Sequence, residues 1–191
     1  MSGSPLLARH AEALDLFSSH VHAIRDDQWD APTPCTEWTV RDLVNHLTGE
    51  QLWVVPLVRD GSTIAEIGDA YDGDLLGQDP VATWDASEAA AREVLREPGA
   101  LDRTVHLSYG DVPAAAYCAQ MTADAVVHAW DLARGIGADD TIPEPLVDFA
   151  LQEYGPHVEE FAGSGLFAPA LPVPSEADAQ TKLLALLGRA A

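Results

Sequence analysis

Apolar residues recur at steps of three and four along much of this chain, and proline or glycine residues separate the repeating stretches. In an α-helix this spacing places the apolar side chains on one face, which must be buried against another element. The stretches that predict long helices are residues 5–24, 39–57, 81–97 and 111–134. The sequence therefore predicts a mainly α protein built as a four-helix bundle.

Capping residues and helix breakers predict the limits of two of these helices. Thr39 and Asp42 have the spacing of a capping box at the start of the second helix. Asp111 is the expected N-cap of the fourth helix, Pro113 lies near its first turn, and Gly135 and Gly137 are expected to end it. The fourth helix is therefore predicted to be the longest in the chain.

The segments between and after the long helices are shorter. Residues 61–80 are rich in Gly and Asp and predict a loop. Alternating polarity predicts a short strand or hairpin at residues 101–109, with a turn at 109–111. Shorter helices are expected at 145–154 and 176–187, on either side of a Gly/Pro-rich stretch at 163–174.

Length and charge restrict the class of protein. We expect one domain over the 191 residues, with a bundle core at about 5–137 and a C-terminal extension at about 138–191. Ten Lys and Arg residues against 31 Asp and Glu residues give a net charge of -21, which repels nucleic acids and anionic membranes. Two Cys residues make no disulfide framework, and no apolar run resembles a signal peptide or membrane span. We expect a cytoplasmic protein.

Charged residues interrupt the apolar face of the fourth helix. At about 100° per residue, Asp124, His128 and Asp131 fall on one narrow face, with Tyr117 and Met121 on the same side. Burying an unpaired carboxylate is costly, so a compensating group is needed. A divalent metal would supply it, because Asp124 and His128 are four residues apart and project from consecutive turns.

A third ligand must come from another helix, and His46 on the second helix is the best candidate. Two histidines and one carboxylate leave a fourth position open on zinc, as in catalytic sites. The alternative is an ion pair between Asp124 and His128, with His46 a hydrogen-bonded interior histidine. Asp131 either orients His128 from behind or accepts a hydrogen bond from an indole or a backbone N–H.

Further candidates for the site come from the same helices. Glu50, one turn after His46, either takes the proton of a thiol or orients His46. The favoured alternative is an exposed acid on the helix surface. Trp53 and Tyr117 are expected to line the pocket, with Met121 beside them. Cys35 lies just before the cap of the second helix, where a helix N-terminus can lower a thiol pKa.

Three sequence blocks resemble a known family. They are WDAPTPCTEWTVRDLVNHLTGEQLW (29–53), DAVVHAWDLARGIG (124–137) and LPVPSEADAQTKLLALLGR (171–189). The chain resembles actinobacterial metal-binding proteins of the DinB superfamily, in the branch of the mycothiol-dependent maleylpyruvate isomerase N-terminal domain. The resemblance implies a DinB-like four-helix bundle with one divalent metal, generally zinc, held by His46, Asp124 and His128.

The resemblance also indicates where this chain differs from the family. The acidic ligand of relatives is often Glu, whereas Asp124 is one methylene shorter. About 50 residues follow Gly137, too few for the second domain that completes the isomerase, so maleylpyruvate isomerisation is not expected. The block around Cys35 recurs in the family as a packing element, which favours a buried, inert thiol over a redox sensor or nucleophile.

Members of this superfamily activate low-molecular-weight thiols, and the predicted site suits that chemistry. Coordination to a divalent cation makes the thiolate the bound species at neutral pH. The favoured function is a metal-dependent, mycothiol-type S-transferase that joins a bound thiolate to a small electrophile. The alternatives are a non-catalytic module that binds a metal or small ligand, and a metal-free helical scaffold that forms a homodimer. Zinc is favoured, although Ni²⁺, Fe²⁺ and Mn²⁺ suit the same ligands.

Overall fold

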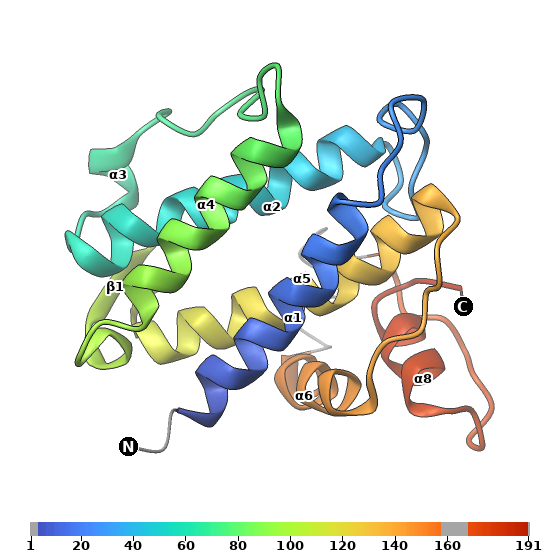
Figure 1. Ribbon diagram of the computed structural model, residues 1–191. Helices are drawn as coiled ribbons and strands as arrows, with labels where there is room; N and C mark the ends of the chain where they lie inside the picture. Colours follow the sequence, from blue (N-terminus) through green and yellow to red (C-terminus); the bar gives the residue numbers. More distant parts are fainter. Residues whose placement is uncertain (1–3, 158–167, 191) are drawn as a thin grey trace.

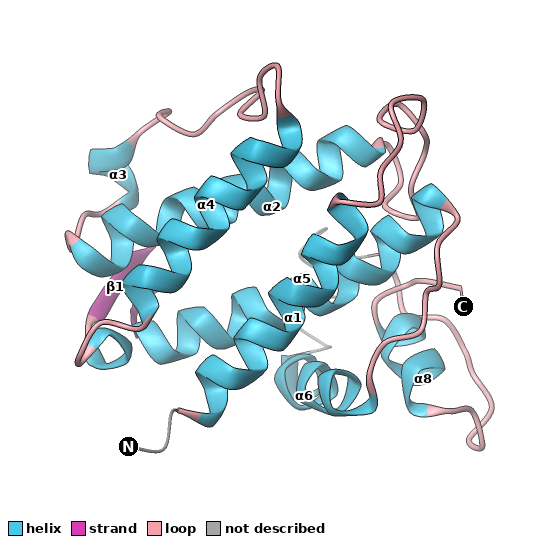
Figure 2. Cartoon of the chain, viewed as in Figure 1, coloured by secondary structure: helices cyan, strands magenta, loops and turns pink. Residues whose placement is uncertain are grey.

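The computed structural model describes residues 4–157 and 168–190, and helices dominate it (Figures 1 and 2). The longer helices are α1 (Pro5–Val21), α2 (Val40–Val54), α4 (Pro80–Leu95), α5 (Ala114–Ile136), α6 (Glu144–Tyr154) and α8 (Ala179–Leu186). The short elements are a π-helical turn η1 (Val55–Arg59), α3 (Ile64–Ile67), two 3₁₀ turns, η2 (Ala100–Asp102) and η3 (Gly155–His157), and the strands β1 (Thr104–Leu107) and β2 (Gly110–Pro113).

Four helices form the bundle that the sequence predicts. In Figure 1, α1 lies along α5, and α2 lies beside α4. The helices α6 and α8 belong to the C-terminal part of the chain, where α6 packs on α5 and α8 packs on α6. The mainly α prediction is therefore confirmed. None of the described helices has the length and apolar character needed to span a membrane.

Among the described residues, the core consists of two clusters of buried apolar side chains. The larger cluster draws on all the longer helices and contains the rings of Phe17 and Trp84, whose centroids are 4.9 Å apart. The smaller cluster joins the end of α2 to α4, η1, β1 and the start of α5. Helix α5 contributes to both clusters, Met121 to the smaller and Ala123 to the larger. Its side chains near residue 124 therefore lie on a helix that is packed along its whole length.

The second helix begins as predicted but ends differently. Thr39 and Asp42 form the expected capping box, with both reciprocal hydrogen bonds present. The α-helical pattern ends at Val54 and continues as the π-helical turn to Arg59, where the N–H of Asp60 donates to the carbonyl of Val55. Pro56 lacks an N–H, so the regular i to i−4 ladder cannot pass through it.

The start of the fourth predicted helix is wrong. Asp111 is not its N-cap, because residues 110–113 form the second strand of a hairpin, in which Asp111 pairs with His106. The Asp111 carboxylate accepts a hydrogen bond from His106 Nδ1 at 2.7 Å. The helix begins only at Ala114, after Pro113. The hairpin uses the backbone groups that a helical turn at Asp111 would need.

Other predicted limits shift by a few residues. The first helix ends at Val21 rather than at residue 24, the third spans 80–95, and the strand is confined to 104–107. The predicted loop at 61–80 contains the short helix α3, which Thr63 and Glu66 cap. The final helix occupies 179–186, and part of the Gly/Pro-rich stretch, 163–167, lies outside the described residues.

Candidate metal centre

Two helices bring the three predicted metal ligands together. On α5, His128 follows Asp124 by one turn, and its Nε2 lies 3.3 Å from Asp124 Oδ2. His46 reaches the same oxygen from α2, with its Nε2 also at 3.3 Å. One ligand atom from each of the three side chains lies within 4.8 Å of the other two. One carboxylate oxygen therefore lies between two imidazole nitrogens from separate helices.

These distances fit a tetrahedral zinc site. Nitrogen and oxygen ligands at about 2.0–2.2 Å from a tetrahedral zinc lie about 3.4 Å from one another. Both N–O distances are close to that value. The donor set, two imidazoles and one carboxylate, is also the type that catalytic zinc uses. Although the side chain of Asp124 is one methylene shorter than that of Glu, its Oδ2 lies 3.3 Å from the Nε2 atoms of both imidazoles.

The electrostatics of the group also favour a cation. Burial opposes ionisation of Asp124, but the neighbouring imidazoles of His128 and His46 outweigh it and lower the carboxyl pKa. Burial likewise opposes protonation of His128, yet the carboxylates of Asp124 and Asp131 outweigh it and raise the imidazole pKa well above its usual value. A positive charge is therefore stabilised between these side chains, and a proton and a metal ion would compete for the same place.

Asp131 lies directly behind His128. The Nδ1–H of His128 donates to Asp131 Oδ2 at 2.9 Å, and the Asp131 side chain is 0% exposed. This hydrogen bond fixes Nδ1 as a donor and leaves Nε2 to face Asp124. Arg189 donates to the same carboxylate at 2.7 Å, so the buried charge of Asp131 is paired. The position of Asp131 is the one expected of a residue that orients His128.

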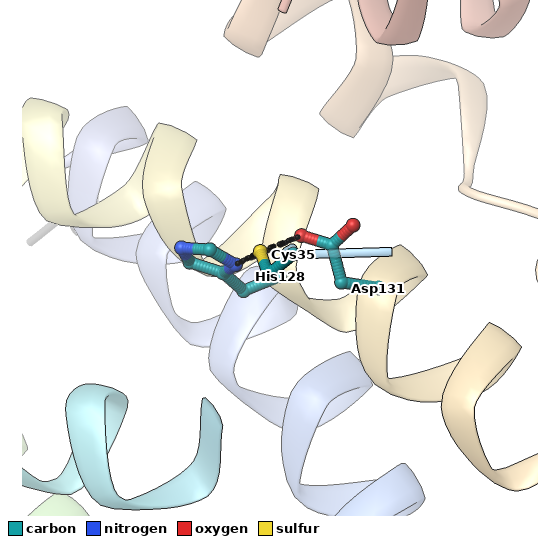
Figure 3. A group of neighbouring side chains, drawn as sticks. All are labelled: Cys35, His128 and Asp131. Atoms are coloured by element: carbon teal, nitrogen blue, oxygen red, sulfur yellow. Dashed lines mark hydrogen bonds and ion pairs between the residues drawn. The ribbon is translucent and has the colours of Figure 1, made fainter. Parts of the chain in front are cut away.

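Cys35 joins this network on the side away from Asp124. Its Sγ–H donates to Asp131 Oδ2 at 3.2 Å, and its Sγ lies 3.7 Å from His128 Nδ1 (Figure 3). Arg189 Nη2 donates to the same sulfur at 3.3 Å. The interpretation of Cys35 as a buried thiol is wrong, because the residue is half-buried and lines a cavity. By distance alone, Cys35, His128 and Asp131 form a second group that could hold a metal ion. The positively charged guanidinium of Arg189 beside the sulfur disfavours a cation there.

Glu50 faces the same centre from α2. Its Oε1 lies 3.8 Å from His46 Nε2, and its Oε2 is buried without a hydrogen-bond partner among the described residues. Burial and the nearby charge of Asp124 raise the pKa of Glu50 well above its usual range. The interpretation of Glu50 as an exposed surface acid is therefore wrong. Its raised pKa and its position beside His46 make Glu50 a candidate for proton exchange at this centre.

Two cavities border the centre. The larger has a volume of about 1190 Å³ and is lined by Met121, Asp124 and His128, among others. The smaller has a volume of about 420 Å³ and is lined by Trp53. Tyr117 lines both. All three side chains predicted to line a pocket therefore border a cavity next to the centre, although Trp53 lies only in the smaller one.

Three side chains that are not among the predicted site residues also lie next to the centre. The ring of Trp38 lies 4.9 Å from that of His46 and 5.9 Å from that of His128, between centroids. Tyr154 on α6 donates its hydroxyl proton to Asp124 Oδ1 at 3.4 Å, and Arg189 holds Asp131. Trp38 directly precedes the N-cap residue Thr39, so the sequence indicates that its ring lies near the start of α2. Nothing in the local pattern indicates that Tyr154 or Arg189 reaches α5.

Comparisons with known proteins agree with this architecture. The model of the mycothiol maleylpyruvate isomerase N-terminal domain family matches residues 10–133, which include His46, Asp124 and His128. Uncharacterized proteins from two strains of Mycobacterium tuberculosis are each 35% identical over 187 residues, 97% of either chain. The crystal structure of a mutant of the mycothiol-dependent maleylpyruvate isomerase matches with a TM-score of 0.60 and 17% identity, covering 81% of this chain and 69% of that one. The structural match confirms the predicted type of fold.

Proposed function

Because the chain belongs to the mycothiol maleylpyruvate isomerase N-terminal domain family, we propose that it is a metal-dependent S-transferase. It would join a low-molecular-weight thiol, such as mycothiol, to a small electrophile. The observation that carries this proposal is the position of Asp124 Oδ2, 3.3 Å from the Nε2 atoms of both His46 and His128. Three protein ligands are the number at a catalytic zinc, which keeps a further position for substrate.

A bound divalent cation would supply positive charge that favours the thiolate over the thiol form of the substrate. A divalent cation held by two neutral imidazoles and one carboxylate would have a net charge of about +1 together with these ligands. That charge suits an incoming thiolate. Zn²⁺ is the cation that fits the ligand geometry best, and Ni²⁺, Fe²⁺ and Mn²⁺ suit the same donor types. The side chains of His46, Asp124 and His128 would hold it.

The other side chains have roles that follow from their positions. Asp131 keeps the Nδ1 proton on His128, so that the lone pair of Nε2 would be available to hold a cation. Glu50 accepts the proton that leaves the thiol and returns it to the product, because its Oε2 is buried and unpaired among the described residues. Trp53, Tyr117 and Met121 form cavity walls that exclude water from the reacting atoms.

The thiol substrate also suggests where the protein works. Low-molecular-weight thiols are kept reduced inside cells, and both Cys35 and Cys118 are free thiols in the structure. We therefore propose a cytoplasmic protein. The proposed binding partners are two small molecules, a thiol and an electrophile. Cavities of about 420 and 1190 Å³ beside the centre are of a size for such molecules.

Elemental analysis of the untagged protein tests the metal. Wild type is expected to hold one divalent metal ion per chain, and His128→Ala is expected to hold none. His22→Ala is the matched control, because His22 also pairs with a carboxylate, that of Asp85 at 2.8 Å, but on the exposed surface. A wild-type protein without metal after growth and purification in zinc would overturn the proposal.

Thiol binding and turnover form the second test. The zinc-loaded protein is expected to bind mycothiol in calorimetry and to consume the thiol when a panel of small electrophiles is added. Binding without any turnover would replace the transferase with a non-catalytic module that binds a metal and a small ligand. Absence of both binding and turnover would refute the proposed function.

A further inference from the structure

The ring of Trp38 lies against both histidines of the candidate centre. Its centroid is 4.9 Å from that of His46, with an interplanar angle of 48°, and 5.9 Å from that of His128, with an angle of 31°. The two imidazoles meet edge to face, at 5.2 Å and 79°. Packed rings prefer offset or edge-to-face contacts with centroids about 4.5–7 Å apart. The three rings therefore form one cluster, in which Trp38 is the member that offers no ligand atom to a metal.

The indole ring orients His46 in a way that its polar contacts cannot. Among the described residues, the polar contacts of His46 are those with Asp124 at 3.3 Å and Glu50 at 3.8 Å, and both use Nε2. Nε2 is also the atom that would hold the metal. His128 differs, because Asp131 fixes its ring through Nδ1. The orientation of the His46 ring therefore depends on packing, and Trp38 supplies that packing from outside α2.

The segment before α2 holds Trp38 in place through its backbone. The N–H of Trp38 donates to the carbonyl of Cys35 at 2.9 Å, and its carbonyl accepts from the N–H and hydroxyl of Thr33 at 3.1 and 2.9 Å. The same segment lies on α5 at Gly135, where an added Cβ would meet Thr33 Cγ2 at 3.2 Å and Val40 Cγ2 at 3.1 Å. The position of Trp38 is thus set by contacts with both helices that supply the histidines.

The backbone just before Trp38 has an unusual conformation. Glu37 has a φ of 75°, and it is the one non-glycine residue with a positive φ in the part of the chain that the structure describes. This left-handed conformation is unfavourable for a residue with a Cβ, and it persists where the surrounding structure imposes it. Because the Glu37 side chain is exposed, its own packing does not offset that cost.

We propose that Trp38 is a positioning residue of the candidate metal centre. Its ring immobilises the imidazoles of His46 and His128 in advance of metal binding, and the turn at Glu37 directs the ring towards them. This inference rests on the proposed function, since it concerns how the same centre holds its metal. A side chain that is already ordered loses less conformational freedom on binding than a mobile one, so preorganised ligands hold a metal more tightly.

Zinc affinity, measured by competition with a chromophoric chelator, is the first test. Trp38→Leu removes the ring and is expected to weaken zinc binding about tenfold, because two imidazoles must then be ordered during binding. Trp38→Phe restores a ring and is expected to stay within about threefold of wild type.

Trp29→Leu is the matched control for the loss of an indole ring. Trp29 lies in the same segment and packs against the same core cluster as Trp38, but it lines neither cavity. Its zinc affinity is expected to stay within about twofold of wild type. Equal affinities of Trp38→Leu and Trp29→Leu would overturn the inference.

A pair of variants at Glu37 tests the turn without touching the ring. Glu37→Gly and Glu37→Val both remove the carboxylate, but glycine accepts a positive φ and a β-branched residue resists it. Zinc affinity is expected to stay within about twofold of wild type in Glu37→Gly and to fall about fivefold or more in Glu37→Val. Equal affinities in the two variants would show that the turn does not position Trp38.

NMR of the metal-free protein separates this inference from the proposed function. The ring protons of His46 and His128 are expected to show ring-current shifts and restricted motion in wild type and in Trp29→Leu, and to lose both in Trp38→Leu. If wild type binds no metal, the proposed function fails, while the ring signals still report whether Trp38 orders the imidazoles. If metal binds and Trp38→Leu changes neither the ring signals nor the affinity, only the inference fails.

Discussion

The guanidinium of Arg189 donates hydrogen bonds to both carboxylate oxygens of Asp131, at 2.9 Å from Nε to Oδ1 and 2.7 Å from Nη2 to Oδ2. The two residues are 58 positions apart in the sequence, and their side chains are 9% and 0% exposed. Asp131 in turn accepts the Nδ1 proton of His128. The C-terminal segment is therefore joined to the candidate metal centre through one buried carboxylate.

This ion pair is expected to contribute strongly to stability. Arg189→Met leaves the Asp131 charge buried without its partner, and should lower the free energy of unfolding by about 3–5 kcal/mol. Urea denaturation at neutral pH measures the loss. Arg25→Met is the control, since Arg25 pairs with Asp27 at 3.3 Å on the surface and should cost less than about 1 kcal/mol. Similar losses of unfolding free energy in the two variants would show that burial of the ion pair between Arg189 and Asp131 adds nothing to its contribution to stability.

Asp131 is also expected to tune metal affinity. Asp131→Asn keeps the size of the side chain but replaces the carboxylate that accepts the His128 proton, so zinc affinity should fall about 10–100-fold. Competition with a chromophoric chelator measures the change. Asp85→Asn, which alters the exposed partner of His22, should leave zinc affinity unchanged. Unaltered affinity in Asp131→Asn would show that the residue has no influence on the metal.

Glu50 is expected to act on the rate rather than on metal binding. Glu50→Gln removes the proton acceptor and should lower kcat by about 10²–10⁴-fold, while metal content stays at one ion per chain. Steady-state kinetics and elemental analysis on the same preparation separate the two effects. Glu144→Gln, an exposed acid in the first turn of α6, is the control. Loss of metal together with activity would instead make Glu50 a ligand.

His10 is expected to make stability depend on pH. Burial, and to a lesser degree the charges of Arg92 and Arg96, lower its pKa to about 4. In the unfolded chain His10 takes up a proton near pH 6.5. In the folded protein it takes up that proton only near pH 4. The stabilisation is therefore complete above pH 6.5 and is lost as the pH falls towards 4, by about 3 kcal/mol in total.

The variant His10→Gln tests this dependence. Glutamine does not titrate and retains an amide that can bond to Thr122, which now contacts His10 Nδ1 at 2.9 Å. Urea midpoints measured from pH 7 to pH 4.5 should fall less steeply for the variant than for wild type. Parallel curves would mean that another group accounts for the loss of stability in acid.

Local patterns in the sequence were sufficient to predict which segments form the long helices, and they placed half of the candidate site. Helical geometry alone places Asp124 and His128 one turn apart, and the capping box at Thr39 depends only on residues three apart. The same local reasoning failed at Asp111, where a helix cap and a hairpin strand compete for the same backbone. Pairing with β1 decided that competition, in agreement with the hairpin and turn that the alternating polarity of residues 101–109 predicts.

Only the packing of distant segments decided the environment of the centre. Arg189 lies beside Cys35 across 154 positions of sequence, and His46 meets Asp124 across 78. Whether Glu50 faces solvent or a cavity likewise depends on what covers α2. Periodicity specifies which face of a helix is buried, because 3.6 residues make a turn in any α-helix. It does not specify which side chains from other elements meet that face, because that depends on the fit of the whole core.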